Sequence, residues 1–275
     1  MPELPEVETI RRSLEEKISG LTITGVDVYL ERIIKEPDNI NTFKEIVTDK
    51  KIEGLDRIGK YLLLRLSEGY VIVIHLRMTG RLLYAAKYED VTKHTHLIFQ
   101  TSNDYHLRFV DIRQFGTIYL LKEDDLKTIR GLAALGPEPL SENFTVNFLS
   151  EKINKKTKKI KQVLLDQDVV AGLGNIYADE VLFDAGILPD RKANTLTEDE
   201  INRLYQSIVK IIKEAICHRG TSFRDYVDGE GEKGNHQNYL KVYQKTNQPC
   251  SRCQCSIKRE KIAGRSSHFC LGCQH

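Results

Sequence analysis

Four cysteines near the end of the chain have the spacing of a metal site. Cys250, Cys253, Cys270 and Cys273 form the pattern C-x2-C-x16-C-x2-C, in which each C-x2-C pair presents two thiolates to one ion. Four thiolates complete a closed tetrahedral shell with no position left for water, so we expect one structural Zn²⁺ ion. Cys255 is an extra thiol beside the first pair and an alternative ligand.

The N-terminus combines prolines with carboxylates in the stretch MPELPEVETIRR. Proline and acidic residues suit the first turn of a helix, and this interpretation fits Pro5. Pro2 differs, because removal of Met1 leaves it with a secondary amine at the end of the chain. The pKa of an α-amino group is about 7.7–8.0, so a useful fraction of the amine is neutral and nucleophilic at physiological pH. The adjacent carboxyl of Glu3 is in place to act as acid and base for such a nucleophile.

Positive charge is concentrated in two places, although the net charge is only +2. Residues 235–275 carry seven Lys and Arg side chains against one acid, which leaves a net −4 for the rest of the chain. The stretch KKTKKIK at 155–161 adds five lysines. One such cluster is usually solvated surface, but two clusters beside a zinc pattern favour a polyanionic partner, in particular nucleic acid. Arg265, in a Gly-Arg turn between the two cysteine pairs, is a candidate phosphate contact.

The composition, 40% hydrophobic and 29% charged, is that of an ordinary globular chain. No run of about 18 apolar residues is present, so no membrane span is predicted. The acidic N-terminus lacks the apolar region of a signal peptide. We therefore expect a protein of the reducing cytoplasm, where its six cysteines serve as metal ligands or free thiols rather than disulfides.

A helix must position the N-terminal groups. Apolar residues recur at helical spacing from Val7 to Ile18, and Gly20 follows as a stop, which predicts an amphipathic helix starting near Pro5. Glu6 is interpreted as support for the start of this helix. Glu8 has no expected role beyond a favourable interaction with the helix dipole.

The remaining elements change type along the chain. From about 21 to 121, short β-rich runs such as KYLLLRL and YVIVIHL indicate an antiparallel sandwich or barrel. The stretch LGPEPL at 135–140 reads as a linker, and helical periodicity follows it. Two helices broken by AGLGN are expected over 160–189, and a longer one starts at a capping box of Thr197 and Glu200. The Gly-rich polar stretch 225–238 predicts a mobile loop.

Six segments in this order resemble the formamidopyrimidine-DNA glycosylases, bacterial enzymes that excise oxidised purines. They are PELPEVETIRR (2–12), GKYLLL (59–64), HLRMTG (75–80), DIRQFG (111–116), AGLGNIYADE (171–180) and the terminal cysteine pattern. The resemblance implies an α+β fold of three domains. These are an N-terminal helix with an antiparallel β-sandwich (1–132), a helix-two-turns-helix domain (133–237) and a four-cysteine zinc-finger β-hairpin (238–275).

The resemblance also implies a bifunctional glycosylase and abasic-site lyase. Pro2 corresponds to the nucleophile that attacks C1′ of the damaged nucleotide and forms a Schiff base, with Glu3 as the acid and base. Lys60 corresponds to the residue that assists β-elimination. Arg265 corresponds to the zinc-finger arginine that grips phosphate and promotes δ-elimination.

DNA contacts are implied in the same way. A base inside a duplex must be flipped out before it can be excised, and side chains fill the gap that it leaves. Met78, Arg113 and Phe115 match the family's filling trio, although composition alone favours a core position for Met78 and Phe115. Phosphate contacts are implied for His94, Lys156, Lys161, Asn175 and Tyr243. The segment 219–227, with Thr221, Ser222 and Arg224, resembles a lesion-capping loop that we expect to order only around a flipped base.

Three positions depart from the family pattern. Arg219 stands at a usual glycine at the entry to the capping loop, Gln254 at a usual glycine in the turn directly after the first cysteine pair, and Gln114 at a usual basic residue. The expected partner is double-stranded DNA with an oxidised purine or an abasic site, bound by a monomer at the bacterial nucleoid.

Two alternatives remain open. One is an endonuclease VIII-like glycosylase for oxidised pyrimidines, against which PELPEVE and the filling trio argue. The other is a non-catalytic zinc protein that binds damaged DNA, against which Pro2, Glu3 and Lys60 argue.

Overall fold

The computed structural model describes residues 1–275. The chain forms two compact units, one of Met1–Ala133 with His218–Asn235 and the other of Ala134–Cys217 with His236–His275. The three-domain division stays a prediction. None of the helices combines the length and the apolar character that crossing a lipid bilayer requires.

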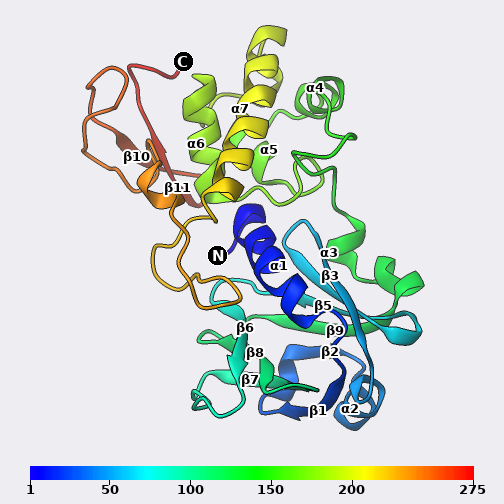
Figure 1. Ribbon diagram of the computed structural model, residues 1–275. Helices are drawn as coiled ribbons and strands as arrows, with labels where there is room; N and C mark the ends of the chain where they lie inside the picture. The colour runs from blue at the N-terminus through cyan, green and yellow to red at the C-terminus, as the bar shows by residue number, and fades with distance from the viewer. The chain divides into compact units, whose positions relative to one another are not determined.

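The first unit begins with helix α1 (Leu4–Ile18), which confirms the predicted helix. Pro5 lies in its first turn, where proline costs no backbone hydrogen bond. Gly20 follows its end with a φ of 86°, a left-handed conformation that glycine adopts without strain. The inner face of α1 is buried and packs on strand β3 (Ile52–Ile58), as Figure 1 shows. The helix therefore mounts its first residues rigidly on a sheet.

Two sheets follow α1. The four-stranded sheet has the order β1-β7-β8-β6, and the five-stranded sheet has the order β2-β9-β5-β4-β3. All neighbours pair antiparallel except β2 and β9, which are parallel. The other strands are β1 (Ile23–Val28), β2 (Ile34–Glu36), β4 (Tyr61–Leu66), β5 (Tyr70–His75), β6 (Gly80–Ala86), β7 (Thr95–Thr101), β8 (Tyr105–Asp111) and β9 (Thr117–Lys122). The short helices are α2 (Ile40–Val47), α3 (Arg130–Ala133), and the 3-10 turns η1 (Glu31–Ile33), η2 (Ser67–Gly69) and η3 (Glu123–Thr128).

The core of the first unit joins α1 to both sheets. Leu14 of α1, Leu64 of β4, Ile72 of β5 and Phe99 of β7 are fully buried in one hydrophobic cluster. Tyr226, from the segment that returns to this unit late in the chain, belongs to the same cluster. Burial of apolar surface stabilises such a core by roughly 25 cal/mol per Å². The strands are thus held in register under the helix that carries the N-terminal groups.

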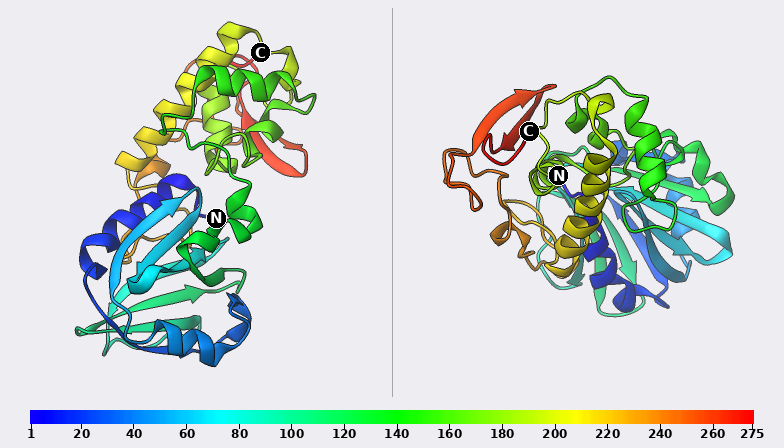
Figure 2. Two further views of the ribbon diagram at one scale, coloured as in Figure 1. Left: turned by 90° about the vertical axis from the view of Figure 1, so that its right-hand side faces the viewer. Right: turned by 90° about the horizontal axis from the view of Figure 1, so that it is seen from above.

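The second unit is helical and ends in a hairpin. Its helices are α4 (Val146–Asn154), α5 (Ile160–Leu165), α6 (Asn175–Ala185) and α7 (Glu198–Cys217), with 3-10 turns η4 (Ala193–Thr195) and η5 (His236–Asn238). The predicted break at AGLGN separates α5 from α6, and the capping box at the start of α7 is present, with the Glu200 N–H donating to Thr197 Oγ1. Helices α6 and α7 pack side by side (Figures 1 and 2). Strands β10 (Lys258–Ile262) and β11 (Arg265–Phe269) form an antiparallel hairpin. The predicted α+β fold is confirmed.

Candidate functional site

The first turn of α1 carries the predicted nucleophile and acid. Pro2 is buried, and Glu3, 3% exposed, is the residue that caps the helix. The Glu3 N–H donates to Glu6 Oε2 at 2.7 Å, so the first turn is closed by a carboxylate of its own helix. Met1 is 48% exposed, and its removal would disturb little packing. The geometry therefore fixes Pro2 and Glu3 side by side on a rigid helix start.

Lys60 lies in the tight turn between β3 and β4. Gly59, before it, has a φ of 59°, and Lys60 itself is 8% exposed. Arg57 fixes this turn, because its Nη1 donates to the carbonyl of Gly59 at 3.0 Å and its Nε donates to Glu8 Oε2 at 3.0 Å. The turn with Lys60 is thus tied to the helix that carries Pro2 and Glu3.

Glu8 has a larger role than the helix dipole, and the interpretation of this residue was wrong. Burial alone would raise the pKa of Glu8, but hydrogen bonds from Arg11, Arg12 and Arg57 outweigh it and lower the pKa to about 2. Arg57 comes from a strand 49 residues away along the chain. Sequence spacing within a helix gives no signal for such a partner.

His75 is a buried group beside Lys60 that sequence reasoning missed. Burial, with the nearby positive charges of Arg77 and Lys60, lowers the pKa of His75 to about 3, so the ring is neutral. Its Nδ1 accepts a hydrogen bond from the N–H of Arg77 at 3.0 Å. Its ring meets Tyr61 edge-on, with centroids 4.5 Å apart. The only sequence feature that could have indicated His75 is its position as the first residue of the segment HLRMTG.

The structure brings the predicted filling trio together at the surface. Met78 is 42% exposed and Phe115 is 52% exposed, so neither is a core residue. Arg113 lies between them: its Nη1 is 2.9 Å from Met78 Sδ, and its guanidinium carbon is 4.8 Å from the centre of the Phe115 ring. The two exposed apolar side chains and the arginine between them form one group at the surface, as the predicted role requires.

A buried carboxylate holds the segment that carries this trio. Asp111, fully buried, accepts hydrogen bonds from the N–H groups of Arg113 at 3.2 Å and Gly116 at 2.8 Å, and from the hydroxyl of Thr79. Gln114, within the same turn, has a φ of 57° and bonds to Arg32. Asp111 is a supporting residue that the sequence pattern did not single out.

A cavity of about 580 Å³ opens beside the trio in the first unit. Its lining includes the apolar residues Met1, Met78 and Phe115 and the cations Arg32, Lys35 and Arg77. Met1 and two members of the trio, Met78 and Phe115, therefore share one cavity with positive charge at its walls. His94, also in this unit, is partly exposed, and its carbonyl accepts from the N–H of Asp111 at 2.9 Å.

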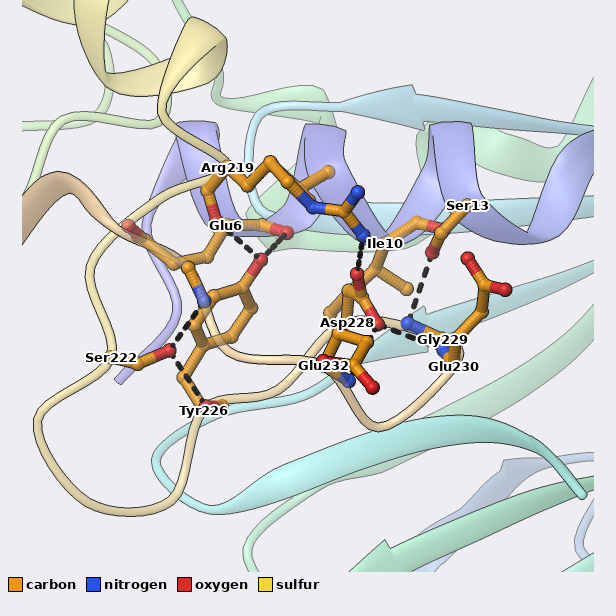
Figure 3. Close-up of polar contacts among 12 residues, drawn as sticks. Glu6, Ile10, Ser13, Arg219, Ser222, Tyr226, Asp228, Gly229, Glu230 and Glu232 are labelled. Carbon is orange, nitrogen blue, oxygen red and sulfur yellow. Dashed lines mark hydrogen bonds and ion pairs between the residues drawn. The ribbon is translucent and has the colours of Figure 1, made fainter.

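The predicted capping segment is tied to α1 (Figure 3). The N–H of Thr221, which is 4% exposed, donates to Glu6 Oε1 at 2.7 Å. The hydroxyl of Ser222 donates to the carbonyl of Tyr226 at 2.9 Å, while Arg224 is exposed. Part of the stretch 225–238, for which a mobile loop was predicted, is packed against the first unit through Tyr226 and Gly229. Gly229 shows why: a Cβ there would lie 2.3 Å from Leu14 Cγ, so this glycine permits close packing.

The predicted phosphate contacts of the second unit are mostly engaged within the protein. Lys161 is 1% exposed, and its ammonium lies 2.6 Å from Asp179 Oδ1, 2.9 Å from the carbonyl of Ser266 and 2.8 Å from Ser267 Oγ. These acceptors use the three donors of an ammonium group. Lys161 is therefore held inside the protein, and its contact with phosphate stays a prediction.

The other three predicted contacts keep part of their surface. Lys156 lies 3.0 Å from Asp166 Oδ2 and remains partly exposed. Asn175, at the start of α6, donates to the carbonyl of Ser266 at 3.1 Å. The Tyr243 ring meets His268 edge-on at 5.0 Å. The N-terminus of α6 beside these groups carries positive partial charge, which suits an anion.

Two neighbouring carboxylates of the segment NIYADE support this region and were not predicted. Asp179 Oδ2 accepts from the N–H of His268 at 2.9 Å, which attaches β11 to α6. Glu180 accepts from three successive N–H groups, of Lys241, Val242 and Tyr243, at 2.7–2.9 Å. Burial raises the pKa of Glu180, although these three hydrogen bonds oppose it.

The four cysteines of the predicted metal site come together. Their Sγ atoms all lie within 4.8 Å of one another, with Cys250 and Cys273 3.8 Å apart and Cys253 and Cys270 3.3 Å apart. Tetrahedral Zn²⁺ with bonds of about 2.3 Å needs sulfurs about 3.8 Å apart, so the cluster fits the ion. Cys255 is exposed and outside the group of four.

Arg265 begins β11 directly after the turn at Ala263 and Gly264. Its side chain is exposed at the tip of the hairpin, where the sequence placed it. The predicted residues thus form two groups, Pro2, Glu3, Lys60 and the trio in the first unit, and Arg265 with the phosphate contacts and the cysteines in the second.

Comparison with known proteins gives consistent matches. The chain matches the formamidopyrimidine-DNA glycosylase N-terminal domain over residues 1–118 and the formamidopyrimidine-DNA glycosylase H2TH domain over residues 135–227. It is 51% identical over 274 residues to the formamidopyrimidine-DNA glycosylase of Pelotomaculum thermopropionicum, covering 100% of this chain and 99% of the relative. The enzyme of the same name from Desulforamulus reducens is 48% identical over 275 residues, with coverage of 100% and 99%.

Solved structures of the Lactococcus lactis protein match over the whole fold. A mutant in complex with a Fapy-dG containing DNA has a TM-score of 0.94 and 41% identity, covering 100% of both chains. A complex with an abasic site containing DNA has a TM-score of 0.93, 41% identity and 99% coverage of both chains. A complex of the wild type with an oxidised pyrimidine containing DNA also has a TM-score of 0.93 and 41% identity, covering 100% of both chains. Because the family's two domains span most of the chain and the identity extends over its full length, this chain belongs to the formamidopyrimidine-DNA glycosylase family.

Proposed function

We propose that this protein is a base-excision-repair enzyme that removes oxidised purines from duplex DNA and then cleaves the strand. The observation that carries the proposal is the burial of Glu3 beside Pro2 at the start of α1, in a chain of a glycosylase family. A buried carboxyl next to a secondary amine suits the proton transfers of nucleophilic attack on a sugar.

In the proposed mechanism, the neutral amine of Pro2 attacks C1′ of the damaged nucleotide, and the base leaves with a proton. Glu3 protonates the sugar oxygen, the ring opens, and an iminium joins Pro2 to C1′. The Glu3 carboxylate, left after that proton transfer, then takes a C2′ proton, which expels the 3′ phosphate, and a second elimination expels the 5′ phosphate. Lys60 assists the first elimination and Arg265 the second.

Met78, Arg113 and Phe115 are proposed to fill the gap left by the flipped base. Their exposure supports this role, since a wedge must be free to enter the duplex. Thr221, Ser222 and Arg224 are proposed to cover the base. His94, Lys156, Asn175 and Tyr243 are proposed to contact phosphates, with Lys161 positioning the hairpin that carries Arg265. The cysteine cluster is proposed to hold one Zn²⁺ ion, which supplies only structural cross-linking.

Borohydride trapping tests the mechanism. Reduction of the iminium should yield a covalent protein–DNA adduct with a duplex containing 8-oxoguanine opposite cytosine. The adduct should be strongly reduced in Pro2→Gly with Glu3 intact, where a primary amine replaces the secondary amine, and should disappear in protein that retains Met1. Pro5→Gly is the matched control, because it removes the other proline of the same turn without touching the amine. Nicking by the wild type without any trapped adduct would show that the Schiff-base mechanism is wrong.

Substrate class needs a comparison of rates, because an oxidised pyrimidine has been seen bound to the Lactococcus lactis protein. We expect faster excision of 8-oxoguanine opposite cytosine than of thymine glycol. The opposite order would favour the endonuclease VIII-like alternative, whereas binding of damaged DNA without cleavage would favour the non-catalytic one.

A further inference from the structure

The segment that follows α7 starts with a left-handed turn at an unusual residue. Arg219 has a φ of 61° and Gly220 a φ of 75°. Glycine adopts this conformation freely, but arginine does so only at a cost in free energy. At Gly220 a Cβ would lie 2.8 Å from Glu6 Oε1, so that residue is required to be small. At Arg219 an interaction of the side chain has to offset the strain.

That interaction is an ion pair with a buried carboxylate (Figure 3). The Arg219 guanidinium donates to Asp228 Oδ2, while Asp228 Oδ1 accepts from the N–H groups of Glu230 at 2.9 Å and Glu232 at 3.0 Å. The Asp228 side chain is 1% exposed. A buried carboxylate is tolerated only with compensating charge and hydrogen bonds, and Arg219 supplies that charge. The pair joins the two ends of the segment 219–228, and we name it the clasp.

The same ends are anchored on α1. Thr221 N–H donates to Glu6 Oε1 at 2.7 Å, and Gly229 N–H donates to Ser13 Oγ at 3.0 Å. The Tyr226 hydroxyl lies 3.3 Å from the carbonyl of Glu6 and 3.2 Å from that of Arg219. Glu6 also accepts from the N–H of Glu3. One carboxylate therefore connects the segment to the helix turn that holds Glu3 and Pro2.

Between these anchors lies a short exposed tip. Phe223 is 40% exposed, and Arg224 is exposed beside it. Only this tip has to move to admit a base, because the flanks are already held. Ordering a loop at the moment of binding lowers affinity through lost conformational entropy, and a loop ordered in advance avoids that loss.

We propose that the Arg219–Asp228 clasp pre-orders the capping segment 221–227, which makes Arg219 a specificity-determining residue for lesions that still carry their base. The inference rests on the proposed function, in which this segment covers a flipped base. A base-containing lesion gains from the pre-ordered segment. An abasic site presents no base to cover and gains nothing.

The experiment compares two substrates with one set of variants. Arg219→Gln keeps the three-carbon stem of the side chain and removes the charged guanidinium, and Arg219→Gly also relieves the backbone strain. In both, kcat/KM for excision of 8-oxoguanine should fall roughly three- to tenfold, the fold-change that corresponds to the net loss of one ordinary hydrogen bond. Nicking of a preformed abasic site by the same preparations should stay within about twofold of wild type. The double variant with Asp228→Asn should be no worse than the single ones, because both remove one interaction.

Lys17→Gln is the matched control. Lys17 of α1 pairs with Glu230 in the same returning segment but outside the clasp. Its loss should leave the ratio of the two activities unchanged. Amide hydrogen exchange over 218–235 gives an independent readout, with faster exchange expected in Arg219→Gln and not in Lys17→Gln.

Each outcome decides the inference. An equal loss on both substrates, or no loss on either, overturns the assignment of specificity. Unchanged hydrogen exchange in Arg219→Gln overturns the clasp itself. If the wild type attacks neither substrate, the proposed function fails, and the exchange experiment still decides whether the clasp orders the segment.

Discussion

At the scale of single residues, the three departures from the family pattern share one backbone feature. Arg219, Gln114 and Gln254 all have left-handed φ angles, of 61°, 57° and 65°. A non-glycine residue in this region is strained by about 1–2 kcal/mol. Arg219 and Gln114 each make a side-chain hydrogen bond, to Asp228 and from Arg32, that offsets the strain. The turn at Gln254 is less ideal than with glycine, as the sequence indicated.

Glu8 is the residue whose environment differs most from a simple helix surface. Three arginines surround its carboxylate, and its side chain is 10% exposed. In the unfolded chain its pKa should lie near the ordinary 4.5, against about 2 in the folded protein. A carboxyl with a lowered folded pKa stabilises the fold above its unfolded pKa, and this stabilisation is lost as pH falls toward the folded value.

Glu8→Gln should therefore destabilise the first unit most above pH 4.5. The shift corresponds to about 3 kcal/mol, at about 1.4 kcal/mol per pKa unit. The difference in free energy of unfolding between variant and wild type should shrink steadily from pH 5 to pH 3. Urea unfolding at several pH values, followed by circular dichroism, measures it. A difference that is constant with pH would mean that the carboxylate charge contributes nothing.

At the scale of elements, a buried ion pair joins α5, α6 and β11. Lys161 of α5 pairs with Asp179 of α6, and both side chains are at most 1% exposed. Lys161 also donates to two residues of β11, and Asp179 accepts from the N–H of His268 in the same strand. Since β11 begins with Arg265, this junction sets the position of the hairpin on the helices.

Lys161→Met should destabilise the second unit by about 3 kcal/mol or more, because it leaves a buried carboxylate without its cation. Urea unfolding followed at 222 nm reports on the helices, most of which lie in this unit. Lys156→Gln is the control, since Lys156 forms a partly exposed pair with Asp166, and its loss should cost less than about 1 kcal/mol. If the Lys161→Met protein were as stable as wild type but bound DNA weakly, the prediction that Lys161 contacts phosphate directly would be supported instead.

At the scale of the whole molecule, the proposed catalytic and metal-binding residues are divided between two separately packed units. Pro2, Glu3 and Lys60 belong to the first unit, and the cysteine cluster belongs to the second. Only a small hydrophobic cluster around Phe183, Val242 and Ile257 supports the cysteines. A small module of this kind usually depends on its metal for folding.

Metal removal should therefore act on one unit alone. After chelation, or in Cys270→Ser, amide exchange in β10 and β11 should become fast, while exchange in β4 and β5 stays slow. Affinity for DNA should fall by an order of magnitude or more, since the basic tail loses its fixed geometry. Cys217→Ser, which changes an exposed thiol outside the cluster, should alter neither. Slow exchange in the hairpin after complete metal loss would contradict a structural ion.

Local patterns allowed much of this protein to be predicted from its sequence. The start of α1 at Pro5, the capping box of α7 and the break between α5 and α6 are set by residues within a few positions of each other. The cysteine spacing predicted the cluster for the same reason, because each pair is a local turn. The order of the motifs along the chain indicated the family. The resemblance to that family in turn indicated Met78, Arg113 and Phe115 as a group of site residues.

Only the tertiary structure decided which groups are buried and which charges meet. Composition favoured core positions for Met78 and Phe115, yet both are exposed. A lysine-rich stretch made Lys161 look like surface, yet it is buried on Asp179. Glycines around residue 229 indicated mobility, yet close packing on Leu14 requires the glycine at 229. The physical reason is common to all three: burial and pairing depend on partners far away in sequence, and a local pattern carries no information about them.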